Sequence, residues 1–233
     1  MGKLILATNG KGGVGKSTLI NLLASKTDKS ILLNIDQTQS IENINAGGYS
    51  VDLIDEDINI NETIESSLID NEYVYVDTPS NFKPGQVDYE RIISILDHVD
   101  LFIIPLKMGK RSVENTLTTI DILFGKDTTS RTKPIKILFI LNDIISTGLK
   151  SKTLEAAKEY VNKNIINELS TIEFSVDVED IYIDYFMNSK AIKTIEDDGV
   201  TLDDLYSKNK GGYRIVESKV VEITNNIKDI LKD

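Results

Sequence analysis

A glycine-rich segment close to the N-terminus constrains the fold of this chain more than any other feature. The apolar run from Leu4 to Ala7 predicts a strand, and the segment after it reads Asn9-Gly10-Lys11-Gly12-Gly13-Val14-Gly15-Lys16-Ser17-Thr18. Apolar residues then recur at helical spacing from Leu19 to Ala24, which predicts a helix directly behind the glycines. A strand, a glycine-rich loop and a helix in succession form an arrangement that binds phosphate at the helix N-terminus.

The residue types in this segment indicate a nucleoside triphosphate as the ligand. Gly10, four further residues, Gly15, Lys16 and Ser17 satisfy the phosphate-loop pattern, in which consecutive backbone N–H groups wrap the phosphates. We expect Lys16 to reach the β- and γ-phosphate oxygens and the Ser17 hydroxyl to ligate Mg²⁺. The alternative is a glycine turn that only joins two core elements. In that case the match to the phosphate-loop pattern, with a strand before it and a helix after it, would be a coincidence.

A second lysine in the loop narrows the class of protein. An ordinary phosphate loop needs only Lys16, whereas Lys11 lies at the first turn, where its side chain would point away from its own phosphates. The residues KGGVGKST resemble the deviant Walker A loop of the ParA/MinD family of ATPases. The resemblance implies that Lys11 reaches the nucleotide of a partner, so that ATP closes a sandwich homodimer; the alternative is a solvated loop lysine. It also implies a nucleotide site made of Gly10, Lys11, Gly12, Gly13, Val14, Gly15, Lys16, Ser17 and Thr18.

The second apolar run, Ile31 to Ile35, ends in Asp36. ParA-like proteins have two aspartates spaced by one residue at this point, and the second orients the attacking water. Aligning the apolar run places Asp36 at this catalytic position, where it would also help to hold Mg²⁺, and Asn34 at the first. In the other register Asp36 is the first aspartate and Thr38 takes the hydrolytic position. A strand-end aspartate that caps a turn is a further alternative.

A third strand pattern carries the remaining metal ligand. Tyr73 to Asp77 followed by Thr78-Pro79 resembles the Walker B strand of the family, in which the aspartate holds Mg²⁺ through water. Asp77 should therefore lie near Ser17, and the segment 81–88 would sense the γ-phosphate. The alternative is that Asp-Thr-Pro only forms a turn.

Asn142 is the candidate contact for the base. It ends the apolar run that starts at Ile137 and resembles the asparagine that contacts adenine in the family. An Asn-Asp pair that forms a turn, here with Asp143, is the alternative.

The order of apolar segments predicts the fold class. Strand-like runs alternate with amphipathic stretches, which favours a doubly wound α/β fold, with a mostly parallel sheet flanked by helices and the ligand beyond the carboxyl ends of the strands. We expect residues 1–233 to form a single P-loop ATPase domain. The stretch 170–180 looks irregular, and 181–195 has no assigned element. The expected strands are Leu4 to Thr8, Ile31 to Asp36, Val51 to Ile54, Tyr73 to Asp77, Leu101 to Pro105 and Ile135 to Leu141.

Composition excludes several related activities. The 233 residues contain no cysteine, which excludes the thiolate clusters and metalloid sites of some ATPases with similar loops. No apolar run is long enough to span a bilayer and no signal-peptide core follows Met1, so we expect a cytoplasmic protein. A terminal helix from about Gly212 to Leu231 has one apolar stripe, and its interleaved acidic residues favour packing on the domain over membrane binding. The stripe comprises Val220, Val221, Ile223, Ile227, Ile230 and Leu231.

Two functions are consistent with the resemblance. The first is a ParA-type ATPase that partitions a plasmid or another replicon, with ATP and Mg²⁺ as cofactors. Its ATP dimer would bind DNA nonspecifically on the nucleoid, and a small basic, centromere-binding, ParB-like partner would stimulate hydrolysis. The net charge of −11 opposes DNA binding unless basic residues cluster locally. The second is a MinD-like ATP-gated scaffold that recruits a protein complex and hydrolyses little.

Overall fold

A seven-stranded sheet forms the centre of the part of the chain that the computed structural model describes, which comprises residues 1–35, 50–54, 58–80, 82–126, 128, 132–144, 149–187, 191–193, 195 and 202–232. The strand order is β3-β2-β4-β1-β5-β6-β7, and every neighbouring pair is parallel. The strands are β1 (Lys3–Ala7), β2 (Ser30–Asn34), β3 (Ser50–Leu53), β4 (Tyr73–Asp77), β5 (Val99–Lys107), β6 (Ile135–Ile144) and β7 (Val178–Met187).

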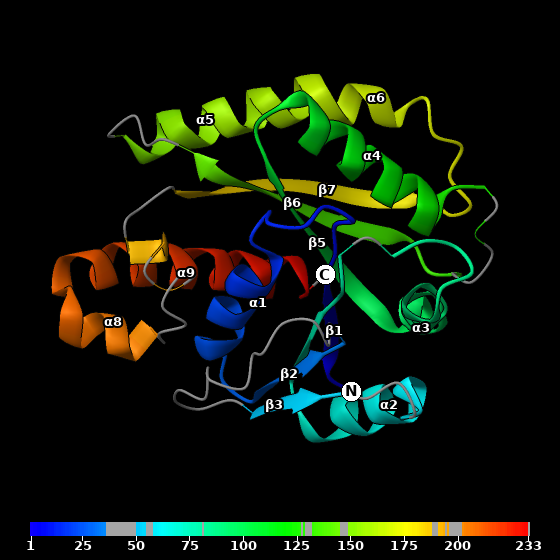
Figure 1. The fold of residues 1–233 in the computed structure, drawn as a ribbon, viewed down its shortest axis with the longest axis horizontal. Coiled ribbons are helices and arrows are strands. Elements are labelled where there is room, and N and C mark those ends of the chain that lie inside the picture. The colour runs from blue at the N-terminus through cyan, green and yellow to red at the C-terminus, as the bar shows by residue number, and fades with distance from the viewer. Residues whose placement is uncertain are drawn as a thin grey trace.

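Helices cover both faces of the sheet (Figure 1). One face is packed by α2 (Ile60–Asp70), α3 (Val87–Ile95), α4 (Lys110–Phe124) and α5 (Lys150–Val161), and the opposite face by α1 (Lys16–Ser25), α8 (Leu202–Lys208) and α9 (Lys210–Ile230). Short helical segments extend two of these helices: the 3₁₀ turn η2 (Leu96–His98) follows α3, and the π-helical turn η3 (Asn162–Ile166) and the short α-helix α6 (Asn167–Leu169) follow α5. This arrangement confirms the predicted doubly wound α/β fold.

The central strands are apolar at successive positions because each face of the sheet has its own core. In β1, Leu4 and Leu6 belong to the core under α2, α3, α4 and α5, whereas Ile5 and Ala7 belong to the core under α1 and α9. All four side chains are fully buried. A parallel sheet covered on both faces requires such continuous apolar runs, which is why the sequence identified these strands.

The edge strand β7 is a correction to the sequence analysis, which placed irregular chain at 170–180 and no element over 181–195. Glu179 and Asp180 interrupt the apolar pattern and are exposed. They lie on the last strand of the sheet, which has a neighbour on one side only. Pairing with β6 then aligns Ile181 with Ile137 and Ile183 with Phe139. An edge strand can carry charges on its open side, so its sequence resembles a loop.

The terminal helix packs on the domain as predicted. Val220, Ile223 and Ile227 of α9 are fully buried against α1 and the sheet. Val221 was wrongly assigned to the buried stripe, since 40% of its surface is exposed. Among the helices that the structure describes, none combines the length and apolar character that crossing a membrane requires.

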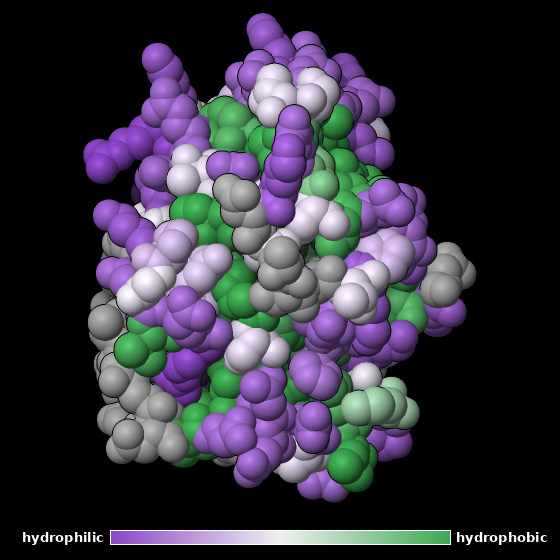
Figure 2. Space-filling model, turned by 90° about the vertical axis from the view of Figure 1, so that its right-hand side faces the viewer, coloured by the Kyte–Doolittle hydropathy of each residue, from purple (hydrophilic) through white to green (hydrophobic). Residues whose placement is uncertain are grey.

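The surface is predominantly polar on the side shown in Figure 2, where hydrophilic residues project outward and hydrophobic residues are visible in the recesses between them. The exposed large apolar side chains are distributed over several elements, including Ile69 in α2, Val87 in α3 and Ile215 in α9. Isolated apolar residues of this kind are normal on a folded protein.

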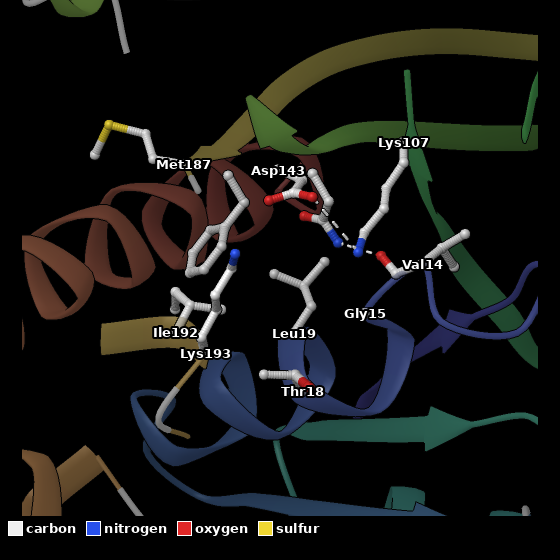
Figure 3. Close-up of a pocket in the computed structure, with 11 residues that line it drawn as sticks. Val14, Gly15, Thr18, Leu19, Lys107, Asp143, Met187, Ile192 and Lys193 are labelled. Carbon is white, nitrogen blue, oxygen red and sulfur yellow. Dashed lines mark hydrogen bonds and ion pairs between the residues drawn. The ribbon is translucent and has the colours of Figure 1, made fainter. Parts of the chain in front are cut away.

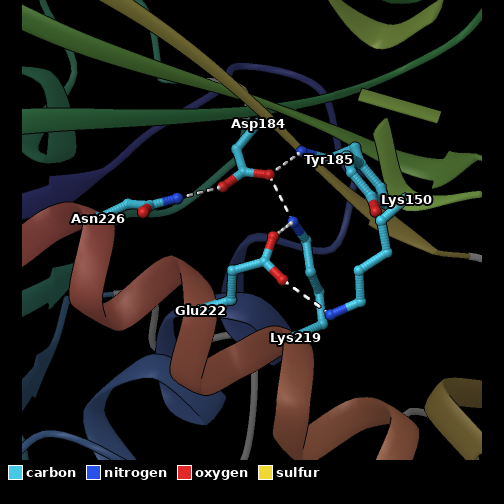
Figure 4. A network of polar contacts seen from close by, with 6 residues as sticks. All are labelled: Lys150, Asp184, Tyr185, Lys219, Glu222 and Asn226. Carbon is cyan, nitrogen blue, oxygen red and sulfur yellow. Dashed lines mark hydrogen bonds and ion pairs between the residues drawn. The ribbon is translucent and has the colours of Figure 1, made fainter. Parts of the chain in front are cut away.

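An ionic cluster centred on the buried pair of Lys219 and Asp184 connects α9 to β7 (Figure 4). The Lys219 ammonium donates to Asp184 Oδ1 at 2.6 Å and to Glu222 Oε1 at 2.7 Å. Asn226 Nδ2 donates to the other Asp184 oxygen at 3.0 Å, and Lys150 Nζ donates to Glu222 Oε2 at 3.0 Å. Burial would raise the pKa of Glu222, but the hydrogen bonds from both lysines more than offset burial and lower it. The carboxylate is therefore ionised at neutral pH.

Removing the cation from this cluster should be strongly destabilising. Lys219→Met would leave the Asp184 carboxylate buried without its ammonium partner, a change that costs about 3–5 kcal/mol in comparable buried pairs. Urea denaturation followed by circular dichroism would measure the loss. Lys126→Met is the matched control, because the Lys126–Glu173 pair is about three-quarters exposed and such pairs contribute little. Equal stability of the two variants would contradict the prediction.

Candidate functional site

The glycine-rich loop joins β1 to α1 at the carboxyl edge of the sheet. Gly13 and Gly15 have φ values of 72° and 87°, in the left-handed region that side chains other than glycine rarely adopt. Gly15 lies directly before the first residue of α1, so the loop leads into the N-terminus of that helix. The backbone thus has the conformation that a phosphate-binding loop requires.

Lys16 lies at the start of α1 and is only 4% exposed. Its ammonium donates to the Ser80 hydroxyl at 2.7 Å, so the loop contacts the segment that follows β4. Ser80 has no predicted role, since a contact between residues 64 positions apart leaves no local signal in the sequence. The contact brings the Lys16 ammonium beside the Asp77-Thr78-Pro79 segment.

The two predicted metal ligands within the described residues lie on neighbouring elements. Ala7, at the end of β1, is aligned with Asp77 at the end of β4, and Thr78 Oγ1 donates to the Ala7 carbonyl at 3.0 Å. Asp77 is fully buried. The Ser17 hydroxyl oxygen is buried and has no hydrogen-bond partner among the described residues. Oxygen donors of these types suit Mg²⁺, so the residues present fit that ion.

The second strand brings another polar residue to the same place. Asn34 ends β2, is 1% exposed and is aligned with Asp77 on β4. An amide at this position avoids placing two carboxylates side by side in a buried site, where one of them would be driven to protonate. Asp36 and Thr38, the two candidates for the hydrolytic position, lie outside the described residues.

Asn142 closes the other end of the loop. Its Nδ2 donates to the Val14 carbonyl at 2.6 Å, while its Oδ1 is buried and has no partner among the described residues. The free acceptor is suited to an exocyclic amine such as that of adenine. Asp143 has a φ of 65° and lies within β6, where the pairing with β7 is irregular between Leu141 and Ile144.

A pocket opens beside Asn142 (Figure 3). Met187 and Ile192 lie on one side of it and Lys107 on the other, where the Lys107 ammonium lies 3.7 Å from Asp143 Oδ2. Phe186 and Met187 were not predicted as site residues, because they lie on β7, which the sequence pattern did not reveal. The lining residues are Val14, Gly15, Thr18, Leu19, Lys107, Asn142, Asp143, Phe186, Met187, Ile192 and Lys193.

Lys11 is partly exposed at the first turn of the loop, and within the described residues no carboxylate lies within ion-pair distance of it. Gly10, Gly12, Val14 and Thr18 complete the predicted set, and all of them lie along the same loop and first helical turn. The structure therefore brings the residues predicted for phosphate, metal and base binding to one edge of the sheet, Asp36 excepted because it is outside the described part.

The fold was compared with known proteins. Neither a protein-family model nor a curated protein matches the sequence. Among solved structures, an McdA variant from Cyanothece in complex with ATP is 15% identical, with a TM-score of 0.59 over 99% of this chain and 96% of that one. MinD from Aquifex aeolicus is 17% identical, with a TM-score of 0.58 over 97% of each chain. A putative plasmid partition protein from Borrelia burgdorferi bound to AMPPNP is 18% identical, with a TM-score of 0.53 over 94% of this chain and 99% of that one.

These similarities extend over nearly the whole chain and establish that it has the fold of the ParA, MinD and McdA proteins. The resemblance read from the KGGVGKST loop is thereby confirmed at the level of the fold. At identities below one fifth, the likeness concerns the path of the backbone.

Proposed function

We propose that this chain is an ATPase of the ParA/MinD type. The observation that carries the proposal is the juxtaposition of the two-lysine loop with the end of β4, where Lys16 Nζ lies 2.7 Å from Ser80 Oγ. ATP phosphates would compete with Ser80 for this ammonium. The Cyanothece and Borrelia structures hold ATP and AMPPNP respectively, which supports an adenine nucleotide as the ligand here.

Hydrolysis would use residues from three strand ends. Ser17 and Asp77 would hold Mg²⁺, with Asp36 as a further metal contact, and the ion would neutralise charge on the phosphate oxygens. Lys16 would stabilise the same charge from the side of α1, and Asp36 would orient the attacking water. Thr38 remains the alternative to Asp36 at the hydrolytic position. Asn142 Oδ1 would accept from the adenine amine.

Lys11 would act in a homodimer. Its exposure at the rim of the loop leaves it available to a second copy, and a cation donated in trans would neutralise charge as an arginine finger does. ATP binding would therefore be coupled to association of two chains.

As the cellular role we propose partition of a plasmid or another replicon, with nonspecific DNA bound by the dimer and a small basic, ParB-like protein as the activator. The charge distribution limits this proposal. Nonspecific DNA binding needs unpaired basic residues on the surface, yet several lysines are paired with carboxylates, namely Lys107 with Asp143, Lys110 with Glu114, Lys126 with Glu173, Lys136 with Glu179 and Lys150 with Glu222. The pairing and the net charge of −11 favour a second candidate, a MinD-like scaffold that recruits a protein complex.

Steady-state hydrolysis measured with and without DNA at low salt separates the two roles. A partition ATPase should bind arbitrary DNA only with ATP and should turn over faster with DNA and its partner, whereas a scaffold should be insensitive to DNA. Absence of ATP-dependent DNA binding in a gel shift would reject the partition role.

Asp36→Ala tests the hydrolytic assignment. Loss of the group that orients water should lower turnover at least about 100-fold while ATP binding persists, so the variant should accumulate as an ATP-bound dimer in light scattering. Asp70→Ala, at the end of α2, is the control and should retain activity. Persistent turnover in Asp36→Ala would transfer the role to Thr38, which Thr38→Ala would then test.

A further inference from the structure

The first turn of the phosphate loop is fastened to α4, a helix that contributes no phosphate ligand in the proposed function. Gly10 N donates to Thr119 Oγ1 at 2.8 Å. The side-chain nitrogen of Asn9, Nδ2, donates to Thr116 Oγ1 and to the Pro105 carbonyl, both at 2.9 Å. Two threonines one helical turn apart therefore hold consecutive residues of the loop.

The contacts leave these side chains little freedom to reorient. Asn9 is fully buried, and its carbonyl oxygen accepts from Lys11 N at 2.9 Å, so both ends of the amide are engaged. Thr119 donates its hydroxyl proton to the Asn115 carbonyl at 2.7 Å, which directs an oxygen lone pair toward Gly10. A buried amide that uses both its donors and its acceptor has one favoured orientation.

Close approach at Gly10 strengthens the same conclusion. A Cβ atom added to this glycine would lie 3.1 Å from Thr119 Oγ1, so the Thr119 hydroxyl would have to shift by a few tenths of an ångström. The close contact shows how near α4 lies to the backbone of the loop at Gly10. Thr116 and Thr119 are 0% and 2% exposed. Their hydroxyls are therefore shielded from water and depend on partners within the protein.

We propose that Asn9, Thr116 and Thr119 are positioning residues that set the direction of Lys11 and thereby control ATP-driven dimerisation. The inference rests on the proposed role of Lys11 in trans. Asn9 accepts from the backbone N–H of Lys11, and Thr119 accepts from that of Gly10. Thr116 in turn holds the Asn9 side chain. The direction in which the Lys11 side chain leaves the backbone is therefore set before nucleotide or partner binds. Preorganisation of this kind strengthens an interface because less freedom is lost on association.

Thr119→Val removes the hydroxyl and keeps the shape of the side chain. Amide hydrogen exchange without nucleotide is the first measurement, and we expect Gly10 to exchange about 3- to 10-fold faster, the equivalent of one ordinary hydrogen bond. Thr118→Val is the matched control, because the Thr118 hydroxyl makes the same kind of contact, to the Glu114 carbonyl at 2.9 Å, on the exposed face of the helix. Thr119→Ser retains the hydroxyl and should restore protection.

The second measurement compares monomer affinity for ATP with the nucleotide concentration that drives dimerisation in light scattering. In Thr119→Val, dimerisation should weaken about 10-fold while the affinity for ATP changes less than about threefold, and Thr119→Ser should recover both. Equal losses of binding and dimerisation, or normal dimerisation together with faster Gly10 exchange, would overturn the positioning role. Wild-type protein that binds ATP without dimerising would instead refute the proposed function of Lys11.

Discussion

Lys16→Ala is expected to abolish measurable ATP binding. The ammonium is nearly buried beside Ser80, where water competes poorly for it, and it would make charge-assisted hydrogen bonds to at least two phosphate oxygens. Such bonds are worth about 1.5–3 kcal/mol each, so the loss should be at least about 100-fold in affinity. Isothermal titration calorimetry with Mg-ATP would measure it.

A lysine outside the site, Lys29, serves as the control for the loss of ATP binding in Lys16→Ala. Lys29 lies before β2, near the amino end of the sheet, where it pairs with Glu72. Lys29→Ala should therefore leave ATP affinity unchanged. If Lys16→Ala bound ATP within about threefold of wild type, the phosphate assignment of this loop would be wrong, and the lysine would serve only to hold Ser80.

Lys11→Ala is expected to separate binding from dimerisation. Lys11 lies on the partly exposed first turn of the loop, so its removal should leave the contacts of a single chain with ATP largely intact. The ATP dimer, however, would lose a cation at each of two equivalent nucleotides, because the interface is used twice. With about 1.5–3 kcal/mol per lost charged contact, dimer affinity should fall at least about 100-fold.

Light scattering on Lys11→Ala and wild type across a range of protein concentrations tests this expectation, with Lys29→Ala again as the control. ATP affinity of the Lys11→Ala monomer should stay within about threefold of wild type. A variant that dimerises normally on ATP would show that the second lysine belongs to its own loop, and the resemblance to the two-lysine mechanism would then not extend to function.

The central strands were predicted correctly because strands buried on both faces appear in the sequence as continuous apolar runs. Ile5, Tyr75 and Ile103 lie on one face of the sheet and their sequence neighbours on the other, so the middle of each strand is apolar at every position. The edge strand β7 escaped detection for the opposite reason. As an edge strand it accommodates the exposed charges of Glu179 and Asp180, and only pairing with β6 distinguishes it from a loop.

Individual residues show the same division within the candidate site. Gly13 and Gly15 adopt positive φ values. Glycine is the residue type that adopts this conformation readily, so the sequence alone suggested it. Asp77 could be placed because the spacing of apolar residues before it marks the end of a strand. The contact of Lys16 with Ser80 and that of Asn142 with Val14 join segments far apart along the chain, and neither has a local pattern.

The amino-acid order thus determined the elements whose requirements are local: apolar strands buried on both faces, a loop whose glycines permit left-handed turns, and polar residues where those strands end. Tertiary structure alone decided which distant side chains complete the site. Asn9, Thr116 and Thr119 have no distinctive pattern in the sequence. They hold the loop because packing of α4 on β5 brings the Thr119 hydroxyl to Gly10 N and the Thr116 hydroxyl to the Asn9 side-chain amide. Hydrogen bonds depend on distances of a few tenths of an ångström, and those distances are set by the packing of the whole sheet.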